Sequence, residues 1–170
     1  MTMDLNESRR ALAASALFRG FKPADIELIL MLCEEAIYRS GDYVFREGDP
    51  GNALYLIVHG QVEVVLEPHG PGERPIPVAV LGPQDSFGEV TLVEDNVQRT
   101  ASVRCRTDAQ LIRMPRDRLL QLCHDYPGIG FQVMHRLAAE MAAKLRASNV
   151  SIREYDLFTH PTYSAEPATS

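Results

Sequence analysis

The sequence predicts a mostly β domain with helices at both ends, because its middle and its ends differ in pattern. Residues 36–115 alternate short apolar runs with turn clusters such as SGD, EGDPGN and GPQD. Strands of about four to eight residues at such regular turn spacing are typical of an all-β barrel or sandwich. The runs expected to form strands are YVF (43–45), ALYLIV (53–58), VEVVL (62–66), VAVL (78–81), ASV (101–103) and AQLIRM (109–114).

The N-terminal helices of the domain are expected in residues 1–35. The first helix breaks at Gly20, and Pro23 suits the first position of a second helix because proline has no N–H to satisfy there. Apolar residues at helical spacing then follow: Ile26, Leu28, Ile29, Leu32 and Cys33.

The C-terminal helices are expected in residues 116–150. A short helix over 116–126 breaks at Pro127, and a longer helix runs over about 130–149. The stretch 151–170 is polar and contains prolines, so we expect a disordered tail there.

Composition narrows the functional classes. The 170 residues are 45% hydrophobic, which is enough for one core, and no apolar run approaches the ~20 residues of a membrane helix. The N-terminus lacks the apolar region of a secretory signal, so we expect a cytoplasmic protein with no membrane partner. The net charge of −6 argues against nucleic acid as a partner, but one pocket can still be cationic and hold a small anion.

Metal sites and disulfides are not expected. The three cysteines, Cys33, Cys105 and Cys123, are widely spaced without a CxxC pair, and the five histidines are scattered. Buried thiols are the better interpretation, and no cofactor is expected.

One segment, residues 87–103, interrupts the rhythm of the strands. A glycine followed by a helix start presents backbone N–H groups that suit an anion, and Arg99 can fold back over the same spot with a fork of donors for phosphate oxygens. Glu89 accepts hydrogen bonds only, so it suits a sugar hydroxyl rather than a phosphate. Together these two side chains predict a binding site for a ribose phosphate.

This segment resembles the phosphate-binding cassette of the cyclic-nucleotide-binding domain family, usually FGE-[LIM]-A-L followed by P-R-[STA]-A. Val90 is a conservative variant, whereas Thr91 replaces a small residue and Gln98 replaces the proline. The hairpin sequence SGDYVFREGDPGNALYLIVHGQVEVV and the helix sequence RLAAEMAAKLRASN extend the likeness to residues 15–150. The matching cassette positions are Phe87, Gly88, Glu89, Leu92, Arg99 and Ala101.

The resemblance implies a β-roll (a double-stranded β-helix or jelly roll) over 36–115, with the cassette at 86–101. It also implies a catabolite activator protein-like sensor domain without the helix-turn-helix, since only about twenty residues follow Asn149. The ligand would be cAMP or cGMP, the protein would not be an enzyme, and the effector protein is unknown. The implied ligand-binding residues are Phe87, Gly88, Glu89, Val90, Thr91, Arg99, Thr100, Ala101, Ser148 and Asn149.

Other interpretations stay open at this point. Ribose binding is the favoured role of Glu89, but a cap of the cassette helix would also explain this residue, and the start of a strand would explain Thr100. The substitutions Thr91 and Gln98 suit a module that keeps the roll but binds no ligand and acts by protein interaction. A cupin-type enzyme or a haem or redox sensor would need clustered ligands that the sequence lacks.

A homodimer through helix 130–149 is also expected. Apolar residues recur at spacings of three and four, as in the seam of a two-helix coiled coil, and the resemblance to the dimer helix of catabolite activator proteins supports this use. The same seam would suit packing against the protein's own roll. Its residues are Phe131, Met134, Ala138, Met141, Leu145 and Ser148.

Overall fold

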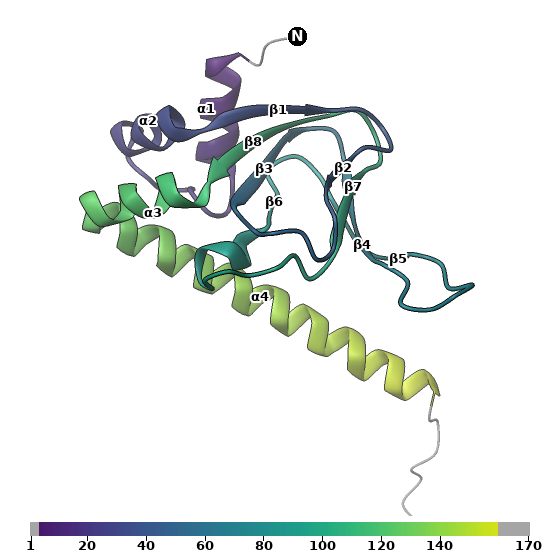
Figure 1. The fold of residues 1–170 in the computed structure, drawn as a ribbon. Coiled ribbons are helices and arrows are strands. Elements are labelled where there is room, and N and C mark those ends of the chain that lie inside the picture. Colours follow the sequence, from purple (N-terminus) through teal and green to yellow (C-terminus); the bar gives the residue numbers. More distant parts are fainter. Residues whose placement is uncertain (1–3, 160–170) are drawn as a thin grey trace, which may run out of the picture.

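Two four-stranded antiparallel sheets form a roll, and helices gather along one side of it (Figure 1). The computed structural model describes residues 4–159, with side chains described for residues 4–148. The sheets have strand orders β1-β8-β3-β6 and β2-β7-β4-β5, so the predicted β-roll with flanking helices is confirmed. The strands are β1 (Glu34–Tyr38), β2 (Tyr43–Phe45), β3 (Ala53–His59), β4 (Val62–Leu66), β5 (Ile76–Leu81), β6 (Ser86–Phe87), β7 (Ser102–Cys105) and β8 (Ala109–Pro115).

The helices begin and end at residues with clear local reasons. Asp4 caps the first helix by accepting a hydrogen bond from the backbone N–H of Asn6 (3.0 Å), and Pro23 occupies the first turn of the second helix, as expected. The bounds are α1 (Leu5–Ala14), α2 (Pro23–Leu32), α3 (Arg116–Asp125) and α4 (Pro127–Thr159).

Strand β3 separates two apolar cores, which explains its unbroken apolar sequence. Leu54 and Leu56 contribute to a cluster beneath the helices, together with Phe18 and Leu137. The alternate residues of β3 face the inside of the roll, in a cluster of Tyr55, Ile57, Phe87, Val103 and Leu111. A strand covered on both faces has no polar face, so the period-two alternation disappears.

Strand β1 was not expected, since the sequence analysis extended the helices to residue 35. The strand is an edge strand, and its first residue, Glu34, takes part in ion pairs instead of packing in a core. Glu34 accepts from Arg113 of β8 (2.6 Å) and pairs with Arg118 of α3 (3.1 Å). An edge strand of this kind lacks the apolar run by which the other strands were predicted.

Helix α4 continues to Thr159, ten residues beyond its expected end and into the stretch predicted to be a tail. The first proline after Pro127 is Pro161, so no proline interrupts the helix before Thr159. The rest of the predicted tail, 160–170, lies outside the described residues.

Two further observations concern the described residues alone. No helix among them is both long and apolar enough to cross a membrane, and no group of three or more potential metal ligands gathers there. The three thiols are free, and burial raises the pKa of Cys33 to about 12 and that of Cys105 to about 11. The expectation of buried thiols holds for Cys105, whereas Cys33 and Cys123 are only partly buried.

We predict that Gly60→Ala destabilises the fold more than Gly41→Ala does. Both glycines have φ near +90° (85° and 90°), so both variants strain the backbone equally. A Cβ at Gly60 would lie 2.3 Å from the carbonyl oxygen of Asp108, whereas Gly41 has no neighbour within 4 Å. The clash should add about 2 kcal/mol to the loss of unfolding free energy. Urea unfolding of the two variants measures the difference, and equal losses would contradict this account of the β3–β4 turn.

Candidate functional site

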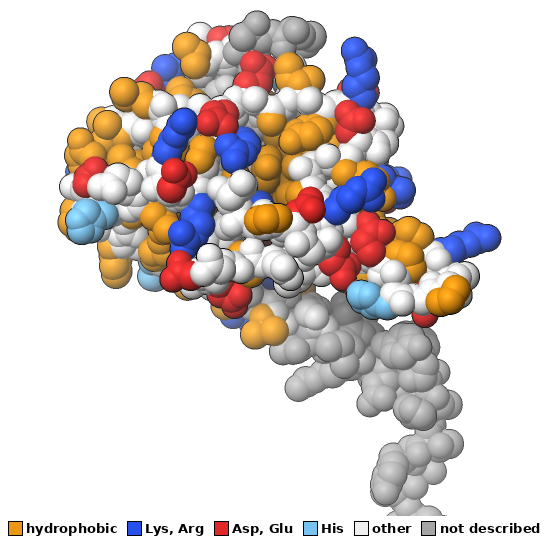
Figure 2. Space-filling view, viewed as in Figure 1, with side chains coloured by type: hydrophobic (Ala, Val, Ile, Leu, Met, Phe, Trp, Pro, Cys, Tyr) orange, Lys and Arg blue, Asp and Glu red, His pale blue; other side chains and the backbone are white. Residues whose placement is uncertain are grey.

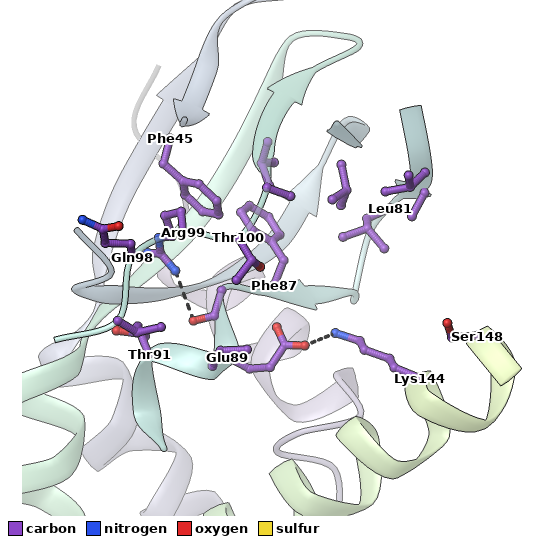
Figure 3. Close-up of a pocket in the computed structure, with 18 of the residues that line it drawn as sticks. Phe45, Leu81, Phe87, Glu89, Thr91, Gln98, Arg99, Thr100, Lys144 and Ser148 are labelled. Carbon is purple, nitrogen blue, oxygen red and sulfur yellow. Dashed lines mark hydrogen bonds and ion pairs between the residues drawn. The ribbon is translucent and has the colours of Figure 1, made fainter. Parts of the chain in front are cut away.

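A cavity of about 600 Å³ opens between the second sheet and helix α4 (Figure 3). Its wall on the sheet side is apolar, and its opposite wall is formed by residues 87–91 and 97–101. Helix α4 contributes Lys144, Ala147 and Ser148. The volume is in the range of small-molecule sites, and an apolar wall with a few polar groups is typical of them. The residues of the apolar wall are Phe45, Val64, Val78, Ala79, Leu81 and Val103.

Arg99 is buried at the base of this cavity with 7% of its surface exposed. Its guanidinium donates to the carbonyl oxygen of Ala53 (2.7 Å) and to that of Gly88 (3.3 Å). The backbone is fixed as well: the N–H of Arg99 donates to Asp49 O and its carbonyl accepts from Gly48 N, each at 2.8 Å. The turn cluster EGDPGN therefore holds the arginine in place.

The charge of Arg99 has no carboxylate partner among the described residues. Its Nε is buried without a hydrogen-bond acceptor, and its guanidinium carbon lies 4.0 Å from the centre of the Phe45 ring. Burial lowers the pKa of Arg99 from its ordinary value, and Asp49 and Glu89 act more weakly in the opposite direction. Carbonyls and a ring face compensate a buried cation only in part, so the site favours an incoming anion.

The side chain of Arg99 lies so close to residue 88 that only a glycine fits there. The residue has φ +79°, and a Cβ there would lie 2.7 Å from Nη1 of Arg99 and 3.1 Å from Ala53 O. After Gly88, where the sequence predicts the start of a helix, the chain forms one 3₁₀ turn, η1 (Glu89–Leu92). A single short turn has little macrodipole, so Arg99 supplies most of the positive field.

Glu89 is held by helix α4. Its side chain is 12% exposed, and Oε1 accepts from Nζ of Lys144 at 2.5 Å. The same Nζ lies 3.4 Å from the carbonyl oxygen of Ser86. Glu89 stands in the first turn of η1, but no side-chain hydrogen bond caps this turn, so the carboxylate is held by its ion pair with Lys144.

Phe87 belongs to an aromatic group between the sheets. Its ring stacks on Tyr55 (centroids 5.3 Å apart, 8° between planes) and lies 5.8 Å from the ring of Phe45. Phe87 is only 4% exposed but contributes to the cavity wall. The ring of Phe45 also faces the guanidinium of Arg99, so the aromatic group packs against the buried cation.

The structure accommodates both residues that depart from the cassette pattern, Thr91 and Gln98. Thr91 is fully buried, and its hydroxyl donates to the carbonyl oxygen of Gly51 at 2.7 Å, so it binds the scaffold although it borders the cavity. The lack of a side chain at Gly51 makes room for it, since a Cβ there would lie 3.2 Å from Thr91 Oγ1. Gln98 forms a β-bridge with Pro50, so this segment keeps its place without a proline.

The other predicted residues fall into two sets. Val90, Thr100, Ala101 and Ser148 border the same cavity, and Thr100 and Ser148 are exposed to solvent. Asn149 lies in α4, but its side chain lies outside the described residues. The structure thus brings nine of the ten predicted residues to one cavity.

Sequence reasoning missed the cavity residues outside the cassette, of which Lys144, Phe45 and the β5 residues matter most. Lys144 stands one helical turn before Ser148, so the face assigned to Ser148 was a signal for it. The apolar runs that contain Phe45 and the residues of β5 predict strands and give no sign of a ligand site.

Comparison with known proteins identifies the family. Residues 35–126 match the cyclic nucleotide-binding domain family. The Cyclic AMP receptor protein of Thermus thermophilus is 34% identical over 138 residues, which are 81% of this chain and 61% of that protein. This chain thus spans about three fifths of that relative.

Solved structures agree with this result. The crystal structure of the Thermus thermophilus catabolite activator protein superimposes with a TM-score of 0.71 at 32% identity, over 84% of this chain and 64% of that one. A cyclic nucleotide-binding domain from Methylobacillus flagellatus KT gives a TM-score of 0.75 at 25% identity, over 88% and 83% of the two chains. With the cassette, the cavity and the buried arginine in place, the chain belongs to the cyclic nucleotide-binding domain family.

Proposed function

We propose that the protein is a sensor that binds one cyclic mononucleotide, with its phosphate on Arg99 and its ribose on Glu89. The observation that carries this proposal is the buried guanidinium of Arg99, which borders the cavity with an unpartnered Nε and no carboxylate partner among the described residues. A cyclic phosphodiester brings one negative charge, which matches one arginine. The charge-assisted hydrogen bonds would offset the cost of burying the cation.

Glu89 and the apolar wall complement the rest of such a ligand. A carboxylate only accepts hydrogen bonds, so Glu89 repels phosphate and suits a ribose hydroxyl. The wall formed by Val64, Val78 and Leu81 offers an apolar surface for a purine. Thr100 and Ser148 add exposed hydroxyls that suit contacts to the phosphate or to the edge of the base.

We propose cAMP as the first ligand to test and cGMP as the second. The relative from Thermus thermophilus is named a cyclic AMP receptor protein, which favours cAMP. A threonine at position 100 is compatible with either cAMP or cGMP. The non-binding module is not favoured, because the two substitutions on which it rested, Thr91 and Gln98, leave Arg99 in its position.

We also propose that the protein acts without catalysis, in the cytoplasm, through an effector protein. The similar proteins described above are a receptor protein and a catabolite activator protein. A nucleic-acid partner is not part of the proposal, since the net charge is −6. On the face shown in Figure 2, acidic and basic side chains are interspersed, and no continuous basic surface is seen.

The proposal includes a homodimer through α4, but the contact residues on the helix differ from those that the sequence predicts. Met134 and Met141 pack against the protein's own core, so they do not belong to an exposed seam. The exposed row consists of Phe131, Ala138 and Leu145, spaced seven residues apart; Phe131 is 73% and Leu145 is 64% exposed. This spacing is that of a two-helix coiled coil. Ser148 borders the cavity of its own chain, and we propose that Asn149 contacts the base bound to the second copy.

We predict that cAMP or cGMP raises the melting temperature and that AMP raises it much less. A ligand at 100 times its Kd should add about 2.7 kcal/mol of stability. AMP carries a second negative charge, and the other cation that lines the described cavity, Lys144, is already paired with Glu89. A thermal-shift series with the three nucleotides measures this, and no shift with either cyclic nucleotide at millimolar concentration would overturn the binding proposal.

We further predict that Arg99→Ala weakens cyclic-nucleotide binding more than Glu89→Ala. Arg99 would meet a full charge, and hydrogen bonds to charged groups contribute about 1.5–3 kcal/mol each, whereas Glu89 would hold a neutral hydroxyl. Calorimetry gives both affinities, with circular dichroism to confirm that each variant folds. An unchanged affinity of Arg99→Ala would refute the role assigned to this residue.

Leu145→Glu should give monomers, because a dimer through α4 would place two unpaired carboxylates face to face. Ala143→Glu is the matched control: it adds the same charge two residues earlier, at another exposed position of the helix. Sedimentation velocity with and without nucleotide measures the state of each protein. A wild type that sediments as a monomer in both conditions would rule out the dimer.

A further inference from the structure

The contact between Lys144 and Glu89 joins helix α4 to the cassette at the cavity. Nζ of Lys144 lies 2.5 Å from Oε1 of Glu89, and the side chains are 48% and 12% exposed. One turn earlier on α4, Glu140 accepts a hydrogen bond from the hydroxyl of Ser86 (3.2 Å). Two successive turns of α4 thus contact the two ends of the segment 86–89.

Only one oxygen of the Glu89 carboxylate accepts a hydrogen bond. Lys144 donates to Oε1, whereas Oε2 has no hydrogen-bond partner among the described residues. Figure 3 shows this second oxygen turned toward the cavity, below Phe87 and Thr100, while Lys144 approaches from the helix. An acceptor fixed in this way loses little rotamer entropy when a hydroxyl binds to it.

We propose that Lys144 is a positioning residue that holds Glu89 ready for the ribose 2′-hydroxyl, so that selection of ribose over deoxyribose depends on helix α4. This inference rests on the proposed function, because it names the sugar that the same site selects. The ammonium also supplies a counter-charge to the carboxylate, whose side chain is only 12% exposed. The opposite possibility is that Lys144 competes with the ligand for Glu89.

The two roles predict opposite results with a matched pair of ligands. A lysine that positions Glu89 contributes to the affinity for cAMP but contributes nothing for 2′-deoxy-cAMP, which has no hydroxyl to offer. A lysine that competes lowers the affinity for cAMP, so its removal raises that affinity. A lysine with a merely structural role affects both ligands equally.

The experiment measures the Kd of cAMP and of 2′-deoxy-cAMP by calorimetry for the wild type, Lys144→Met, Lys144→Arg and the control Arg146→Met. Arg146 is an exposed cation two residues further along α4. The wild type should bind cAMP roughly tenfold or more tightly than the deoxy analogue, as expected for a hydrogen bond to a charged acceptor. Lys144→Met should reduce this preference to below about threefold, through weaker binding of cAMP alone. Lys144→Arg should keep most of the preference, and Arg146→Met should keep all of it.

Each other outcome has a definite meaning. Equal weakening of both ligands in Lys144→Met, or tighter binding of cAMP, overturns the positioning role and leaves the proposed function intact. A wild type that binds cAMP without preference over the deoxy analogue overturns it as well. A wild type that binds neither cAMP nor cGMP overturns the proposed function itself, and the role of Lys144 with it.

Discussion

The buried charge of Arg99 is the constraint on which the rest of the site depends. A guanidinium at 7% exposure needs partners, and the described structure supplies two carbonyls and one ring face but no carboxylate. Gly88 has to be a glycine because a Cβ would collide with Nη1, and the turn at Gly48 and Asp49 holds the backbone of the arginine. The glycine at position 88 and the turn at Gly48 and Asp49 thus both hold Arg99 in place, while its Nε has no hydrogen-bond acceptor.

The same residues connect the site to both cores. Ala53, whose carbonyl accepts from Arg99, begins β3, and the next residues of that strand alternate between the inside of the roll and the helices. On the other side, Arg116 at the start of α3 donates through Nε to the carbonyl oxygen of Thr91 (2.6 Å) and pairs with Asp95, while its backbone N–H donates to Asn52 O (2.9 Å). The cassette is therefore fastened to β3, α3 and α4, so a shift of the cassette must strain or move at least one of them.

Much of the fold could be predicted because the apolar runs of the sequence coincide with strands, as in β2 and β4. Strand β1 could not be predicted by that signal, because Glu34 contributes through ion pairs with arginines distant in sequence. Most of the site could be found because most of its polar residues lie close together in the sequence, between Glu89 and Thr100. Lys144 could not be found in this way, since its role depends on a contact across 55 residues that only the packing of α4 against the roll brings about.

Helix α4 shows why periodicity alone could not assign its faces. Apolar residues spaced by three and four suit an internal core and a coiled coil equally, and the helix carries both kinds: Val133 and Leu137 are buried, whereas Phe131 and Leu145 are exposed. A third face carries Lys144 and Ser148 to the cavity. Since one turn of helix behaves as a rigid unit, any rotation that changes the contact of Lys144 with Glu89 also turns Leu145, the next residue. The exposed row and the contact with Glu89 therefore lie on the same turn of one helix, with no other element between them.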